Sequence, residues 1–206
     1  MKKVLFPNLK KRNIIVCMSA PAGTGKTTIA EELLKDTKLN ISKFTTCTSR
    51  LKREAEVDGS CYHFLSRDEF EKGISQGAFL EWEENHGNLY GIRKSDIERE
   101  LKSDKNFLLV IDIKGSFSVM DIFPDDTILL VVLPPSFEEL EKRLKVRGKI
   151  DKKELETRLE TAKKELKICQ DSSDKINYLV VNDDFDCAVD EIKSIIVAEQ
   201  LKVVNY

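Results

Sequence analysis

The chain has 206 residues, 41% of them hydrophobic, which suits one compact α/β domain. Lysine and arginine total 34 against 36 aspartate and glutamate residues, so the net charge of -2 argues against bulk nucleic-acid binding. The five cysteines lack C-x-x-C spacing and only two histidines are present, which disfavours a zinc site and favours free thiols in a reducing cytoplasm. The longest apolar run, 128–133, is too short to span a bilayer.

The first predicted elements are a buried strand over 13–19 and a helix that begins near Gly25. The segment between them matches the phosphate-binding pattern G-x-x-x-x-G-K-[ST] at all but its first position. Its residues, all expected to bind ATP, are Ala20, Pro21, Ala22, Gly23, Thr24, Gly25, Lys26, Thr27 and Thr28. The glycines let backbone N–H groups and a helix N-terminus point at the anion. We expect Lys26 to reach the β- and γ-phosphates and Thr27 to contact Mg²⁺, largely through water.

Ala20 stands where this pattern has its first glycine. If that residue must adopt a left-handed conformation, alanine costs about 1–2 kcal/mol relative to glycine. If its backbone angles are ordinary, the change costs little. The sequence leaves both readings open.

Residues 44–92 differ from the rest, with short strand-like pieces rich in Thr, Tyr, Phe and Trp around one helix at 66–76. Ser66 and Glu69 are spaced as a capping box at the start of that helix. The segment therefore predicts a small inserted lobe with antiparallel strands instead of another βαβ unit.

Further along the chain, buried strands are predicted at 107–113, 127–133 and 176–182, with a closing helix at 186–199. A second capping box is formed by Ser136 and Glu139. An apolar stripe from Leu155 to Cys169 predicts one long helix. This alternation of strands and helices predicts an α/β fold whose parallel sheet is flanked by helices.

The stretch 46–64 resembles the GMP-binding signature of guanylate kinases, roughly S-x-T-T-R-x-x-R-x-x-E-x-x-G-x-x-Y-x-F. The segments 79–82 (Phe-Leu-Glu-Trp) and 87–91 (Gly-Asn-Leu-Tyr-Gly) follow at the family's spacing, and the resemblance covers about 14–196. It implies a P-loop enzyme that moves the γ-phosphoryl of ATP to GMP, and to dGMP, giving ADP and GDP in the cytoplasm.

The chemistry of these residues agrees with a nucleotide acceptor. Arg50 and Arg53 can grip one phosphate with forked N–H groups, and two tyrosine hydroxyls can assist. A carboxylate at Glu81 can accept from guanine N1–H and N2–H together, whereas adenine would leave it unpaired. Ile92 replaces a family hydroxyl. The expected GMP-binding residues are Thr46, Arg50, Arg53, Tyr62, Glu81, Tyr90, Gly91 and Asp112.

Three further arginines match the family pattern R-x-x-x-R-G…R, namely Arg143, Arg147 and Arg158. The resemblance places them on a lid, where they neutralise the transferred phosphoryl group together with Lys26 and Arg50. The alternative is that they only form surface ion pairs with Glu139 or Glu154. Asn182 is expected to face adenine, and its alternative is a strand-end turn with an aspartate helix cap.

The resemblance implies one domain over 1–206 with a core of 13–43, 93–135 and 170–200. Residues 44–92 would form a small mixed α/β GMP-binding insertion, and about 136–169 a helical lid. Two other functions stay open: a guanylate-kinase-like binding module without catalysis, and a P-loop kinase with another acceptor. The expected partners are the small molecules ATP and GMP, with no nucleic acid and no membrane, and a homodimer is left open.

Overall fold

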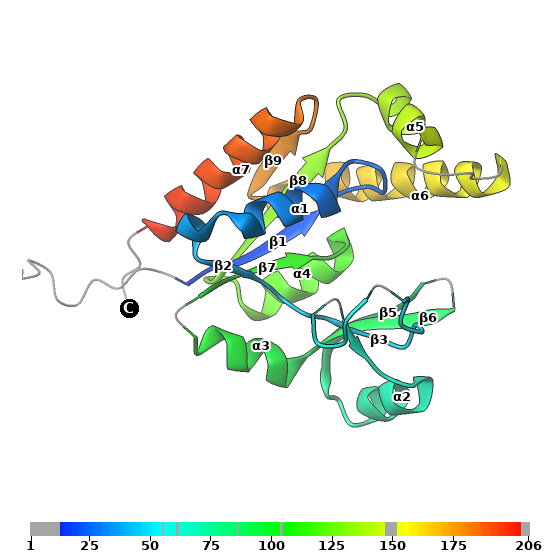
Figure 1. The fold of residues 1–206 in the computed structure, drawn as a ribbon, viewed down its shortest axis with the longest axis vertical. Coiled ribbons are helices and arrows are strands. Elements are labelled where there is room, and N and C mark those ends of the chain that lie inside the picture. Colours follow the sequence, from blue (N-terminus) through cyan, green and yellow to red (C-terminus); the bar gives the residue numbers. More distant parts are fainter. Residues whose placement is uncertain are drawn as a thin grey trace, which may run out of the picture.

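The main sheet of the protein is parallel. The structure is a computed structural model, which describes residues 13–54, 56–60, 62–85, 87–103, 105–146 and 152–202. Its strands run in the order β2-β7-β1-β8-β9 (Figure 1). They are β1 (Ile15–Ser19), β2 (Ile41–Lys43), β7 (Asn106–Val110), β8 (Thr127–Leu133) and β9 (Tyr178–Val181). All four neighbouring pairs are parallel, which confirms the predicted P-loop type of α/β sheet.

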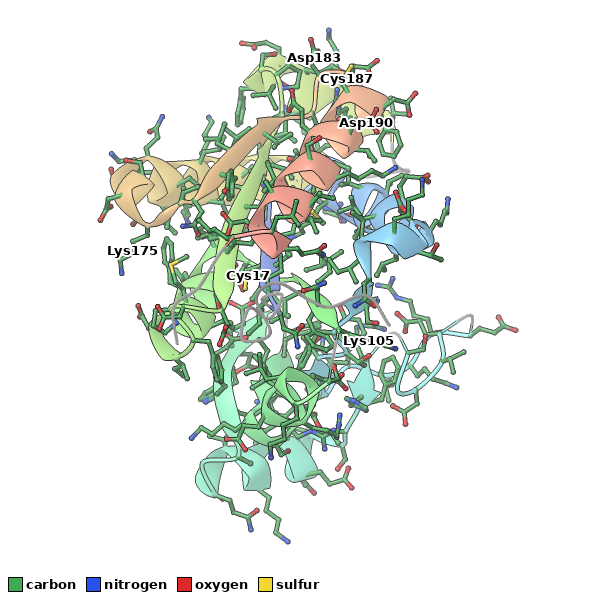
Figure 2. All side chains as sticks on the ribbon, turned by 90° about the vertical axis from the view of Figure 1, so that its left-hand side faces the viewer. Cys17, Lys105, Lys175, Asp183, Cys187 and Asp190 are labelled. Carbon is green, nitrogen blue, oxygen red and sulfur yellow. The ribbon has the colours of Figure 1, made fainter. Side chains whose placement is uncertain are left out.

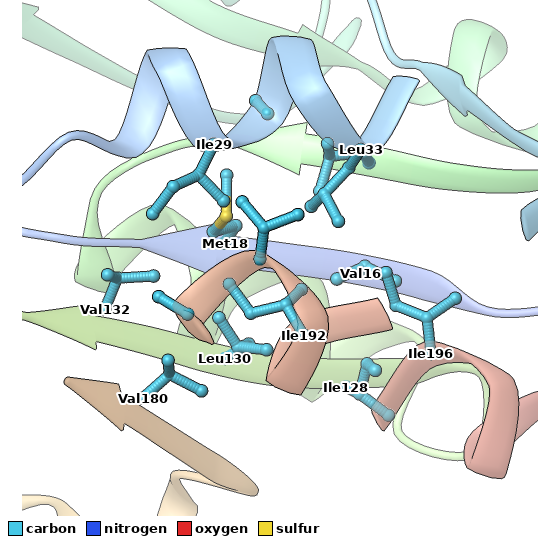
Figure 3. Packing of buried hydrophobic residues seen from close by; sticks show 14 of the residues in the cluster. Val16, Met18, Ile29, Leu33, Ile128, Leu130, Val132, Val180, Ile192 and Ile196 are labelled. Carbon is cyan, nitrogen blue, oxygen red and sulfur yellow. The ribbon is translucent and has the colours of Figure 1, made fainter. Parts of the chain in front are cut away.

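Helices cover both faces of this sheet, which is why β1 is buried along its whole length. On one face, α1 (Lys26–Lys35) and α7 (Phe185–Gln200) pack against every second side chain of β1. The intervening side chains of β1 point to the opposite face. Figure 3 shows Ile29 of α1 and Ile192 of α7 in the same buried cluster as Met18 of β1. The opposite face is covered by α3 (Lys94–Leu101), α4 (Ile113–Ile122) and α6 (Lys152–Asp171).

A second sheet has the strand order β4-β3-β6-β5 and carries α2 (Arg67–Ser75). Its strands are β3 (Cys47–Thr48), β4 (His63–Phe64), β5 (Phe79–Asn85) and β6 (Asn88–Arg93). Two of its pairs are antiparallel, but β3 and β4 run parallel, so the predicted antiparallel lobe is a mixed sheet. The reason is the long connection between β3 and β4, because a tight hairpin would have made them antiparallel.

Two predicted strands are shorter in the structure than their predicted ranges, and one strand was not predicted. The strand predicted at 107–113 ends at Val110, because the Asp112 side chain accepts from two backbone N–H groups and begins α4 at Ile113. The strand predicted at 176–182 begins only at Tyr178, after the short 3₁₀ helix Ser173–Lys175. The edge strand β2 was not predicted, because three residues are too few to show a pattern.

The two predicted capping boxes have different outcomes. Ser66 and Glu69 form the complete reciprocal pair at the start of α2. At α5 (Phe137–Val146), the Ser136 hydroxyl accepts from the Glu139 N–H, whereas the Glu139 carboxylate binds Arg143. The remaining short helix is a 3₁₀ turn at Thr37–Leu39.

The cysteines in the described part of the chain are free thiols. Cys17, Cys47 and Cys169 are buried, and Figure 2 shows Cys17 in the interior and Cys187 near the outer start of α7. Burial raises the pKa of Cys47 to about 11, so this thiol stays protonated at neutral pH. Cys61 lies outside the described residues. Within the described ranges, we find no helix with the length and apolar character needed to cross a membrane.

Candidate functional site

A cavity of about 380 Å³ opens where β1 and β7 end, between the phosphate loop, the second sheet and α6. Ligands of open α/β sheets bind at such carboxyl ends of parallel strands. Figure 1 shows α5 and α6 on one side of this edge and the second sheet on the other. The predicted site residues that line the cavity are Ala20, Pro21, Ala22, Gly23, Gly25, Lys26, Thr27, Thr46, Tyr62, Glu81, Tyr90, Gly91, Asp112 and Arg158.

The phosphate loop is shaped by two glycines in left-handed conformations. Gly23 has φ 90° and Gly25 has φ 102°, and a Cβ on Gly25 would lie 2.7 Å from the Asn182 amide nitrogen. Because α1 begins at Lys26, the N–H groups of its first turn face the loop. The loop thus has the glycine conformations and the adjoining helix N-terminus that binding of an anion by backbone N–H groups requires.

Ala20 has ordinary backbone angles, since Asn40 is the only non-glycine residue with positive φ in the described part of the chain. Its side chain is 5% exposed and belongs to the core beneath α1. The left-handed penalty considered for this alanine therefore does not arise.

We expect Ala20→Gly to leave kcat/KM for ATP within about twofold of the wild type, because no strain is relieved. Unfolding should become easier by about 1 kcal/mol, because glycine gains more freedom in the unfolded chain. Steady-state kinetics and urea unfolding measure the two effects. A tenfold rise in turnover would contradict the backbone assignment.

Lys26 begins α1 and reaches into the cavity. Its Nζ donates to the Ile111 carbonyl oxygen at 3.4 Å, which is a weak contact that a phosphate can replace. Burial lowers the pKa of Lys26, and the carboxylates of Glu165, Asp112 and Glu83 act to raise it. The Lys26 ammonium therefore lies in a cavity whose lining includes these three acidic side chains.

Glu81 projects from β5 against the first turn of α4. Its carboxyl carbon lies 3.2 Å from the position that a Cβ on Gly115 would take. Burial, followed by the charges of Asp112 and Glu83, raises the pKa of Glu81 to about 7. Opposite it on β6, Ile92 is 1% exposed in the core, so it offers the cavity no polar atom.

Arg50 pairs with Glu56 through two hydrogen bonds, from Nη2 at 2.7 Å and from Nη1 at 3.0 Å. Its guanidinium lies 5.6 Å from the Tyr62 ring centroid. Arg53 is exposed, and its backbone N–H donates to the same Glu56 carboxylate at 2.8 Å. Neither arginine lines the cavity, so Glu56 holds the forked face of Arg50 that we assigned to phosphate.

Arg143 and Arg158 form the ion pairs that were considered as their alternative role. Arg143 Nε donates to Glu139 at 3.2 Å, and Arg158 Nη2 donates to Glu154 at 2.6 Å. Pairs of this i,i+4 kind contribute only about 0.3–0.5 kcal/mol, so a phosphate can displace them. Arg147 lies outside the described residues.

Asn182 ties the end of β9 to the phosphate loop, because its side-chain amide donates to the Thr24 carbonyl oxygen at 2.6 Å. The backbone carbonyl oxygen of Asn182 accepts a hydrogen bond from Arg143 Nη1 at 2.9 Å. Both residues line a second cavity of about 320 Å³ together with Thr24. The predicted aspartate cap is confirmed, since Asp184 accepts from the Cys187 N–H at the start of α7. Thr28 is exposed and lines neither cavity.

Two carboxyl groups in the first cavity, Glu83 and Glu165, were missed from the sequence. Within the described residues, Glu165 Oε2 is buried without a hydrogen-bond partner, and burial raises the pKa of Glu165. The available signals were spacings: Glu83 alternates with Glu81 on a strand, and Glu165 lies two helical turns after Arg158.

Comparison with known proteins shows which family the chain resembles. The family model described as guanylate kinase matches residues 10–199. A guanylate kinase of Clostridium acetobutylicum is 39% identical over 195 residues, covering 95% of this chain and 90% of that protein. The one from Caldanaerobacter subterraneus subsp. tengcongensis is also 39% identical, with 95% and 92% covered.

A solved structure shows the same likeness. The crystal structure of guanylate kinase from Anaplasma phagocytophilum superposes with a TM-score of 0.74 at 32% identity. The match covers 94% of this chain and 89% of that one. From the matched family model and these relatives, we conclude that the chain belongs to the guanylate kinase family.

Proposed function

We propose that this chain transfers the γ-phosphoryl group of ATP to GMP, giving ADP and GDP. The observation that carries the proposal is one cavity that joins a phosphate loop, with Lys26, to a half-buried carboxyl at Glu81. The loop suits the donor phosphates, and the carboxyl suits the donor edge of guanine. Membership of the guanylate kinase family supports the same assignment.

On the donor side, the loop backbone and Lys26 would hold the ATP phosphates. Thr27 lines the cavity beside Lys26, so its hydroxyl would contact Mg²⁺, with water and phosphate oxygens as the other ligands. A single protein hydroxyl suits Mg²⁺, because this ion usually keeps several waters and binds substrate phosphates. When bound, the ion neutralises charge on the phosphates. Asn182 would border the adenine end.

On the acceptor side, Glu81 and Thr46 would read guanine, and the hydroxyls of Tyr62 and Tyr90 would bind the phosphate. Arg50 would exchange Glu56 for that phosphate. Arg53 and Asp112 complete the set we propose. The phosphate of GMP is already anionic, so the reaction needs positioning and charge neutralisation instead of a general base.

The lid arginines would supply this neutralisation. Arg158 already lines the cavity, and Arg143 lies at the other side of the phosphate loop. With Lys26, Arg50 and Arg147 they form the proposed catalytic set. Closure of α5 and α6 over ATP would keep water from the phosphoryl group.

The experiment that tests this function follows ADP formation from Mg-ATP with GMP, dGMP, AMP, CMP, UMP or no acceptor. We expect turnover with the guanine nucleotides alone, because Glu81 would be left unpaired by the other bases. No turnover with a folded protein would favour the binding module. Turnover with a different acceptor would favour another kind of P-loop kinase.

We also propose that the chain works in the cytoplasm. Four free thiols in the described residues are compatible with a reducing compartment. A homodimer stays open as an assembly.

A further inference from the structure

Glu83 is a third acidic side chain in the acceptor part of the cavity, next to Glu81 and Asp112. Side chains of a β-strand alternate between its two faces, so Glu81 and Glu83 share the inner face of β5. Trp82 between them is 46% exposed and does not line the cavity. Two carboxyl groups on the same face of one strand therefore line one cavity, and packing alone does not explain why acidic side chains lie there.

The register of β5 and β6 places Glu83 directly across from Tyr90 and two residues along the strand from Glu81. Glu83 pairs with Tyr90, whereas Glu81 pairs with Ile92. Two residues along a strand span about 6.6 Å. The glutamate side chain is shorter than that of tyrosine, so the Glu83 carboxyl ends nearer the strand than the Tyr90 hydroxyl does. A nucleotide whose base lies at Glu81 and whose phosphate lies at the Tyr90 hydroxyl would then have its ribose beside Glu83.

Asp112 lines the same cavity as Glu83. One oxygen of Asp112 accepts from the N–H groups of Lys114 at 2.7 Å and Gly115 at 3.0 Å, which anchors it at the start of α4. Burial, followed by the nearby charge of Asp112, raises the pKa of Glu83. Carboxyl oxygens accept hydrogen bonds, so a hydroxyl group of a ligand can donate to Glu83.

We propose that Glu83 accepts a hydrogen bond from a ribose hydroxyl of the acceptor nucleotide and so makes the enzyme prefer GMP to dGMP. This rests on the proposed roles of Glu81 and Tyr90 in binding the acceptor. A deoxy nucleotide lacks the hydroxyl that would donate to the Glu83 carboxyl oxygen, so the enzyme should use that nucleotide less well than GMP. Since Glu83 is only half-buried, water partly replaces the hydroxyl, and we expect about a tenfold preference.

The test compares kcat/KM for GMP, 2′-deoxy-GMP and 3′-deoxy-GMP in the wild type, Glu83→Ala and Glu83→Gln. The expected wild-type preference for GMP over at least one deoxy analogue is about tenfold. Glu83→Ala should bring that ratio close to one, and the isosteric Glu83→Gln should give an intermediate ratio. Thermal unfolding checks that both variants are folded.

Glu84→Ala is the matched control, because Glu84 is the exposed neighbour on the other face of β5, where it pairs with Arg67. It should keep the wild-type ratio. A wild type that does not discriminate, or an equal loss for GMP and both deoxy analogues in Glu83→Ala, would overturn the proposal.

Calorimetric binding of GMP and dGMP measures the same preference without turnover. A protein that binds GMP about tenfold more tightly than dGMP but makes no GDP would refute the phosphotransferase while supporting Glu83. Equal binding of both nucleotides by an active enzyme would refute only the role of Glu83. The two failures are therefore distinguishable.

Discussion

Replacing Lys26 with methionine is expected to lower kcat for GMP phosphorylation by about 10²–10³-fold, the usual effect of removing one group that stabilises transition-state charge. Methionine keeps the length and apolar stem of the side chain, and the contact it removes is a long hydrogen bond of 3.4 Å to Ile111. The melting temperature should therefore change little. Coupled ADP assays and thermal unfolding measure the two quantities.

Lys35→Met is the matched control for this variant. Lys35 ends the helix that Lys26 begins, and its exposed side chain pairs only at the surface with Glu32 at 2.8 Å. Removal of such a pair should leave kcat unchanged. Wild-type turnover in Lys26→Met would refute the assignment of the phosphate loop, whatever the control shows.

Glu81→Gln is expected to lower kcat/KM for GMP by about 100-fold while KM for ATP stays close to the wild-type value. The amide has one acceptor oxygen and an NH₂ group that would face the guanine donors, so one contact is lost and one becomes unfavourable. The measurement is steady-state kinetics with each substrate varied in turn. Equal losses for GMP and ATP would contradict Glu81 as the guanine reader.

The raised pKa of Glu81 also predicts how GMP binding depends on pH. Burial, then Asp112 and Glu83, raise this pKa to about 7, so the empty site increasingly holds a neutral carboxyl below that pH. Guanine N1–H and N2–H need the ionised form. Affinity for GMP should therefore rise as pH increases through 7 and level off about one unit above it.

Glu81→Gln provides the control for the pH profile, because the GMP phosphate also ionises near about pH 6. The variant keeps the phosphate ionisation and loses the contribution of Glu81. Subtracting its profile from that of the wild type should leave one transition near pH 7. Identical profiles in the two proteins would show that Glu81 does not titrate during binding.

The sequence by itself determined the features that depend on local patterns. Five or more apolar residues in a row predicted the strands at 127–133 and 13–19, because strands covered on both faces need such runs. The spacing from Gly23 to Lys26 predicted a phosphate loop, since conformation there depends on the glycines themselves. The capping box at Ser66 is likewise local.

Only the tertiary structure decided how these local elements combine at the site. Whether Ala20 is strained depended on its backbone angles, and whether Arg50 faces phosphate or Glu56 depended on the fold of the loop between β3 and β4. Glu83 and Glu165 became site residues because β5 and α6, far apart in the chain, meet at one cavity. Such contacts between distant segments leave no periodic signal in the sequence, because each is set by packing and not by neighbouring residues.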